Sequence, residues 1–248
     1  MDKLSLDFLL ESIHLLAFVN PFAEQRDEIE GTIIRQMGRT ESPWIRNSKF
    51  TNEFNQVLYW VEQGEQSLLS GMAKGYESAV RAEQMASLAY FSLYHELVDD
   101  LDDLIESEES DLTASRKLFK KIESGIKKRR PLVSGGRSTM WEKPEHLFAC
   151  FYQLRRAFHC LFNEIVGWSE PVRALRVRVW ESVFTKDMLS YQQWMHESVG
   201  RFPTLILGPT GSGKEIVARA IGLSRFIPYD PSSGQFASNP KKSFCPVN

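Results

Sequence analysis

The sequence has few cysteines, and their placement gives no sign of a disulfide framework. Cys150, Cys160 and Cys245 are odd in number, lie far apart and form no CxxC pair. A small secreted domain held by disulfides would need an even set at regular spacings. Reduced thiols are typical of an intracellular protein, so the sequence predicts a cytoplasmic location.

The chain also lacks a long apolar run and an excess of charge of one sign. Residues 1–20 carry an apolar stripe, but Asp7, Glu11 and His14 interrupt it, and no basic segment or small-residue cleavage site accompanies it. A signal peptide and a membrane span are therefore not predicted, and no membrane partner is expected. The formal net charge of -2, with 42% hydrophobic and 25% charged residues, is typical of a soluble globular protein and not of a nucleic-acid binder.

Helical periodicity is the strongest pattern present. Apolar residues recur at spacings of three and four, and they predict helices over residues 6–17, 24–37, 54–105 (weakened at Gly64, Gly71 and Gly75) and 146–164. Runs of alternating apolar and polar residues with hairpin turns are absent. Residues 1–163 are therefore predicted to form a helical domain, with a loop or hinge over the Pro/Gly/Ser-rich residues 131–145.

Two blocks of opposite charge follow each other in this region. The acidic block spans residues 99–111 and the basic block spans residues 116–130. A basic block can bind nucleic acid, but this one lacks the interleaved aromatic platform that single strands stack on. A solvated helix face that neutralises the neighbouring acidic block is the favoured interpretation.

A second pattern, His146 and Cys150 followed by His159 and Cys160, raises the question of a metal site. Spacing of four places His146 and Cys150 on one helix face, but phenylalanines surround them. Burial in a packing face is favoured over metal binding, so no metal ligand is predicted.

Near the C-terminal end, residues 208–214 read G-x-x-x-x-G-K. The apolar stretch 202–207 before them predicts a short buried strand, and the stretch after them predicts an amphipathic helix, which is the order that a phosphate-binding loop requires. Glycines would let successive N–H groups converge on phosphate oxygens, and Lys214 would reach the terminal phosphates. The alternative is a glycine-rich turn that binds nothing. The predicted phosphate-binding residues are Gly208, Pro209, Thr210, Gly211, Ser212, Gly213, Lys214 and Glu215.

Glu215 departs from the usual pattern, because this position normally supplies a Ser or Thr hydroxyl to Mg²⁺. A carboxylate can accept helix N–H groups or hold a metal through water, yet it also repels phosphate. Taken alone, it argues against direct magnesium ligation.

The stretch GPTGSGKEIVARAIGLSR, residues 208–225, resembles the Walker A motif and following helix of the sigma-54-dependent transcriptional activators, or bacterial enhancer-binding proteins. In these AAA+ ATPases glutamate usually follows the lysine. IVGWSEPVRALRVRVWE, residues 165–181, resembles the segment that opens their ATPase domain and closes over adenine, which implies a nucleotide contact for Ile165, Val166 and Gly167. FCPVN, residues 244–248, resembles the strand after the first helix.

The resemblance implies a mainly α N-terminal regulatory or sensing domain over residues 1–163. The beginning of an α/β P-loop (AAA+) domain, incomplete, would follow over residues 164–248. It implies ATP and Mg²⁺ as cofactors, the latter through residues mostly missing here. The partners that it implies for the full-length family are sigma-54 RNA polymerase and further copies of the chain in a hexamer-type ring, with DNA bound through a C-terminal domain absent here.

The resemblance also implies that the sequence stops after the second strand of that domain, before the Walker B acidic residues and the arginine finger. No catalytic residue is therefore predicted, and the chain is expected to bind ATP without hydrolysing it. Two alternatives stand beside this interpretation. One is a P-loop AAA+ ATPase of another branch, and the other is a helical interaction module with a vestigial P-loop.

Overall fold

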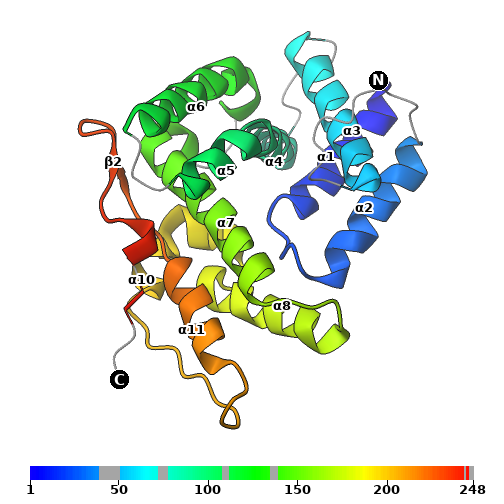
Figure 1. Ribbon diagram of the computed structural model, residues 1–248. Coiled ribbons are helices and arrows are strands. Elements are labelled where there is room, and N and C mark those ends of the chain that lie inside the picture. The colour runs from blue at the N-terminus through cyan, green and yellow to red at the C-terminus, as the bar shows by residue number, and fades with distance from the viewer. Residues whose placement is uncertain (39–50, 72–77, 108–111, 135–138, 243, 246–248) are drawn as a thin grey trace. The chain divides into compact units, whose positions relative to one another are not determined.

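The computed structural model describes residues 1–38, 51–71, 78–107, 112–134, 139–242 and 244–245 (Figure 1). The chain divides into two compact units. The first unit comprises Met1–Val19, Ala23–Glu96 and Ser124–Ser138, and the second comprises Asn20–Phe22, Leu97–Glu123 and Thr139–Asn248. The predicted domain boundary after residue 163 stays a prediction.

The first unit is built from helices α1 (Lys3–Leu16), α2 (Glu24–Met37), α3 (Asn52–Leu69) and α4 (Ala79–Glu96), and from the end of α6 (Leu112–Val133). Helix α1 begins after Asp2, whose carboxylate accepts the backbone N–H of Ser5 at 2.8 Å. This side chain satisfies one of the donors that a helix start leaves open. Helix α1 packs on α2, α3 and α4, and its leucines at positions 9 and 10 are fully buried.

A buried ion cluster lies in the core of the first unit. Arg129, on α6, is 1% exposed, and its Nε lies 2.5 Å from Oε1 of Glu65. Its Nη2 lies 2.7 Å from Oε2 of Glu96. The prediction of a solvated basic face is therefore wrong for Arg129, although Lys121 pairs with Asp100 at 2.6 Å as expected.

The second unit holds α5 (Val98–Glu106), the start of α6, and the elements that follow it along the chain. These are η1 (Thr139–Glu142), α7 (Pro144–Glu164), α8 (Glu170–Phe184), α9 (Met188–Ser190), the π-helix η2 (Tyr191–Met195), α10 (His196–Val199), α11 (Lys214–Leu223), β1 (Tyr229–Asp230), β2 (Gln235–Phe236) and η3 (Pro240–Lys242). Helix α6 reaches Val133, so the predicted loop at 131–145 begins later than expected. Its residues 135–138 lie outside the described part of the chain.

Helix α7 is the central element of the second unit. It packs against α5, α8, α11, η1 and β1, and every residue from Leu147 to Ala157 is buried. A helix buried on all sides is apolar all round, as this aromatic-rich sequence is. Gln153, Arg155 and Arg156 are polar exceptions. The Nε and Nη2 of Arg155 bind the two carboxylate oxygens of Asp102 on α5 at 2.5 and 2.7 Å.

A small antiparallel hairpin follows α11. Tyr229 of β1 pairs with Phe236 of β2, and the turn between the strands contains Gly234 at a φ of 74°. No hairpin was predicted from the sequence, because strands of two residues are too short to show an alternation of apolar and polar residues. The informative signal was the turn itself, since Asp230 accepts the N–H of Ser232 at 2.9 Å.

The predicted beginning of an α/β P-loop domain is wrong. In the described ranges the hairpin contains the only strands, and the rest of the regular structure is helical. Residues 202–207 form no strand, and Leu205 and Leu207 are each 81% exposed. Figure 1 shows no arrow on the trace between α10 and α11. Phe244 and Cys245 are not in a strand either, and residues 246–248 lie outside the described part.

The physical reason is the hydrogen-bond requirement of a strand. A strand's N–H and C=O groups need a neighbouring strand, whereas a helix satisfies its own. The described residues supply no partner strand beside residues 202–207, so their backbone stays in water.

Candidate phosphate-binding loop

The loop at residues 208–213 takes backbone conformations that only glycine adopts easily. Gly211 and Gly213 have φ values of 79° and 80°, in the left-handed region. A Cβ at Gly208 would lie 2.8 Å from the hydroxyl oxygen of Ser212, an exposed side chain that can rotate away. The sequence-based reason for the glycines is consistent with this geometry at Gly211 and Gly213.

Lys214, the first residue of α11, folds back over the loop. Its Nζ donates to the carbonyl oxygens of Gly208 at 2.8 Å and of Pro209 at 2.6 Å. The ammonium therefore lies inside the turn, close to where the motif requires a positive charge. Both hydrogen bonds are exposed to solvent, so an anion can reach the ammonium and replace the carbonyl oxygens as its acceptor.

The N-terminus of α11 leaves several backbone donors open. The N–H groups of Ile216 and Val217 both donate to the carbonyl of Gly213, at 3.0 and 3.3 Å. In the part of the chain that the structure describes, no acceptor bonds the N–H groups of Gly211, Gly213, Lys214 and Glu215. Open donors at a helix start, together with the partial positive charge of the helix, attract an anion.

Glu215 lies in the first turn of α11, and it is exposed. Its carboxylate is well placed to interact with the helix dipole, which stabilises the helix without a ligand. Across the described ranges, no group of three or more His, Cys, Asp or Glu side chains could hold a metal ion. His146 Nε2 lies 2.6 Å from the carbonyl oxygen of Gln192, and burial raises the pKa of the Cys150 thiol next to it.

Ile165, Val166 and Gly167 lie at the end of α7 and just beyond it. Ile165 is buried and its carbonyl accepts from Nη2 of Arg176 at 2.5 Å, while Val166 is 78% exposed. Gly167, at a φ of 133°, lies against Val172. No hydrogen bond or ion pair among the described residues joins these three to residues 208–215, so their contact with adenine stays a prediction.

Two residues of α7 that hold the C-terminal end of α11, the helix after the loop, were not predicted from the sequence. Arg156 of α7 donates from Nε to the carbonyl of Leu223 at 2.7 Å and from Nη2 to the carbonyl of Arg225. Gln153 donates to the carbonyl of Ser224 at 3.0 Å. These bonds fix the C-terminal end of α11 to α7, and burial lowers the pKa of Arg156. The available signal was a pair of arginines within an apolar helix, which indicates buried partners.

Comparisons with models of protein families, with curated proteins and with solved structures found no match. Within the described ranges, no helix combines the length and the apolar character needed to cross a membrane.

Proposed function

We propose that the loop from Gly208 to Lys214 binds the phosphate groups of a nucleotide. The observation that carries the proposal is the position of Lys214 Nζ, 2.8 and 2.6 Å from two loop carbonyls, beside open backbone donors at the start of α11. A phosphate at this position would accept hydrogen bonds from the N–H groups. It would also replace the two carbonyl oxygens as the acceptor for the Lys214 ammonium. The glycines at positive φ let the backbone approach the anion closely.

Phosphate binding at this position requires the loop and helix α11, and it does not require a sheet. Helix α11 is held at its far end by Arg156 and Gln153, so the open N-terminal end projects from a fixed base. A preorganised donor set loses less entropy on binding than a mobile one. The packing of α11 on α7 therefore supports phosphate binding without the strand that was predicted before the loop.

The test is calorimetric titration of the full chain with ATP and with ADP, with and without Mg²⁺. Lys214→Ala is expected to weaken ATP binding by about tenfold to a hundredfold, because one charge-assisted hydrogen-bond partner is lost. Lys186→Ala, at an exposed lysine of the second unit, is the matched control and is expected to bind as the wild type does. Equal affinity in wild type and Lys214→Ala would refute the proposal.

We further propose, on the sequence resemblance of residues 208–225, that the nucleotide is ATP and that the chain is a cytoplasmic transcriptional regulator. It would act with sigma-54 RNA polymerase and as an oligomer of its own copies. Purified full chain should then bind purified sigma-54 in an ATP-dependent manner, and Lys214→Ala should abolish the ATP dependence. Binding that does not respond to ATP would contradict this.

One observation favours a second function, a helical interaction module with a vestigial P-loop. The strand that normally carries such a loop is missing, and the exposed Leu205 and Leu207 give the loop no buried support on that side. The same titration separates the two functions. A well-folded chain that binds no ATP would exclude the first and leave the second.

A further inference from the structure

The second unit contains a cavity of about 630 Å³ that lies apart from the phosphate-binding loop. Its walls come from α5, the start of α6, α7, α11 and the residues after β2. Small-molecule sites usually measure roughly 300–1,000 Å³, so this cavity has room for a ligand of modest size. All its lining residues belong to the second unit.

Apolar side chains form much of the wall. Leu104 of α5 and Leu223 of α11 line it, together with two aromatic rings. The rings of Tyr152 and Phe236 stack with their centroids 4.3 Å apart and an angle of 25° between their planes. A rigid aromatic pair beside aliphatic side chains is a surface that favours an apolar ligand body.

The charged side chains among the described lining residues are all cationic. Arg156, Arg219 and Lys241 line the cavity, and its described lining residues include no aspartate or glutamate. Lys241 Nζ donates to the carbonyl of Ser107 at 2.7 Å. Glu164, which does not line the cavity, pairs with Arg219 at 3.8 Å in a partly exposed pair, which neutralises Arg219 weakly.

Arg156 is the most informative of these cations because it is 4% exposed. Its Nε and Nη2 bind carbonyl oxygens at the end of α11, while its Nη1 is buried and has no hydrogen-bond partner among the described residues. The guanidinium lies 5.3 Å from the centre of the Tyr152 ring. A buried guanidinium that no described carboxylate pairs with is costly, and an anion in the cavity would compensate its charge.

We propose that this cavity binds an amphipathic monoanion, a carboxylate with an aliphatic body. The carboxylate would lie toward Arg156 and Arg219, and the body would lie among Leu104, Leu223 and the ring of Phe236. Binding here is independent of nucleotide binding, because no residue of the loop lines the cavity.

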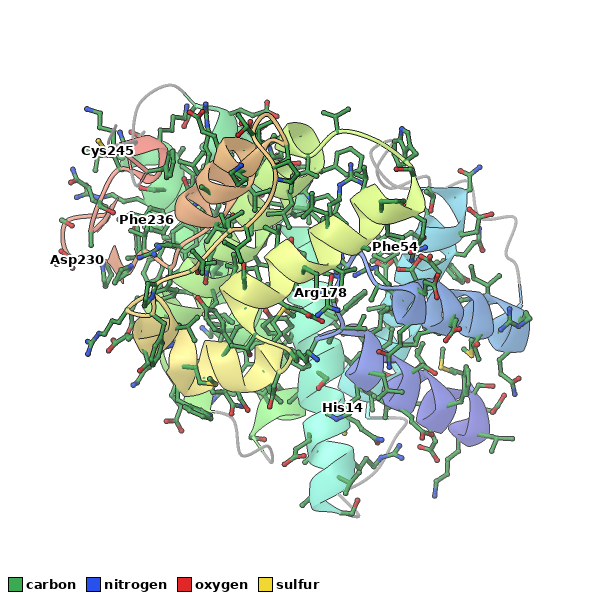
Figure 2. All side chains as sticks on the ribbon, turned by 90° about the horizontal axis from the view of Figure 1, so that it is seen from below. His14, Phe54, Arg178, Asp230, Phe236 and Cys245 are labelled. Carbon is green, nitrogen blue, oxygen red and sulfur yellow. The ribbon has the colours of Figure 1, made fainter. Side chains whose placement is uncertain are left out.

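The test uses decanoate as the probe, titrated into the full chain by calorimetry below the micellar concentration. Saturable binding at one site is expected, and decyltrimethylammonium, of equal length and opposite charge, is expected not to bind. Arg219→Gln should weaken decanoate binding by roughly tenfold, since it removes one charged donor while leaving the buried Arg156 in place. Arg178→Gln is the matched control, because Arg178 is exposed on α8 and does not line the cavity. Figure 2 labels Arg178 and, on the hairpin, the cavity-lining Phe236.

Cys160 gives an independent readout because it lines the same cavity. In a Cys245→Ser variant, decanoate should slow the alkylation of Cys160 by iodoacetamide, while Cys150 is fully buried and reacts little. Absence of saturable binding, equal affinity for the cationic probe, equal affinity of Arg219→Gln and wild type, or an unchanged alkylation rate would each overturn the proposal. Lys214→Ala should bind decanoate as the wild type does, which separates this site from the loop.

Discussion

Helix α7 and residues 202–207 are both apolar in sequence, yet they lie in opposite environments. In α7, Leu147, Phe148 and Phe151 are fully buried, whereas Leu205 and Leu207 are each 81% exposed. The two stretches differ in how their backbones are satisfied. A helix closes its hydrogen bonds over four residues, and a strand needs another strand.

This comparison shows what apolar character alone can and cannot predict. The backbone hydrogen bonds of α7 are made within the helix itself, and its apolar surface then favours burial. For residues 202–207, burial would require partner strands, and none is present in the described ranges. An apolar run therefore predicts a buried strand only when its pairing partners can be named as well.

The largest expected effect comes from the ion pair that ties α7 to α5. Asp102→Ala removes from the buried Arg155 guanidinium its two carboxylate contacts, at 2.5 and 2.7 Å. Removing one partner of a buried pair typically costs about 3–5 kcal/mol of unfolding free energy. Urea denaturation followed by circular dichroism measures the change.

The control for this experiment is Asp100→Ala, on the same helix. Asp100 pairs with Lys121 at 2.6 Å, but both side chains are partly exposed. An exposed pair contributes about 1 kcal/mol or less, so this variant should stay close to wild type. Similar losses in the two variants would show that Asp102 and Arg155 are not shielded from water as the structure has them.

A matched pair of leucines tests the comparison directly. Leu147→Ala removes a side chain that is 0% exposed and should cost about 2–5 kcal/mol, from lost burial and the cavity left behind. Leu205→Ala removes one that is 81% exposed and should change stability by about 0.5 kcal/mol or less. The same denaturation experiment serves both. A large loss in Leu205→Ala would mean that residues 202–207 are covered in solution.

The fold was predictable where local periodicity decides it. Helix α2 has the bounds predicted for it, Glu24–Met37, and α7 begins two residues before the predicted His146. Both signals depend on residues three and four apart, so no distant partner is needed to read them. The hairpin was missed because its pairing is set by a turn, and the burial of Arg129 depends on Glu65, 64 residues away in the sequence.

The candidate site was predictable in its loop and not in its support. Glycines at 211 and 213 indicated a backbone at positive φ, and the structure has both. The two arginines in the apolar α7 indicate buried partners, but they do not identify the end of α11 as the partner of Arg156, because that contact joins residues 67 positions apart. The motif predicts the conformation of the loop, whereas the contacts that hold α11 in place depend on the tertiary fold.

The smallest expected effect is a pH dependence at the edge of α7. The ring of His196 lies against that of His146 on this helix, with centroids 4.5 Å apart and an angle of 44° between the planes. Burial, with a further contribution from His146, lowers the pKa of His196 below 6.5, and Glu197 partly opposes this. The unfolded chain therefore binds a proton at a pH where folded His196 does not, so the free energy of unfolding should fall as the pH drops below about 6.5. Denaturation between about pH 7.5 and 5 should show this slope in wild type and a flatter one in His196→Gln; an equal slope in the two would mean that His196 is as solvated in the folded chain as in the unfolded one.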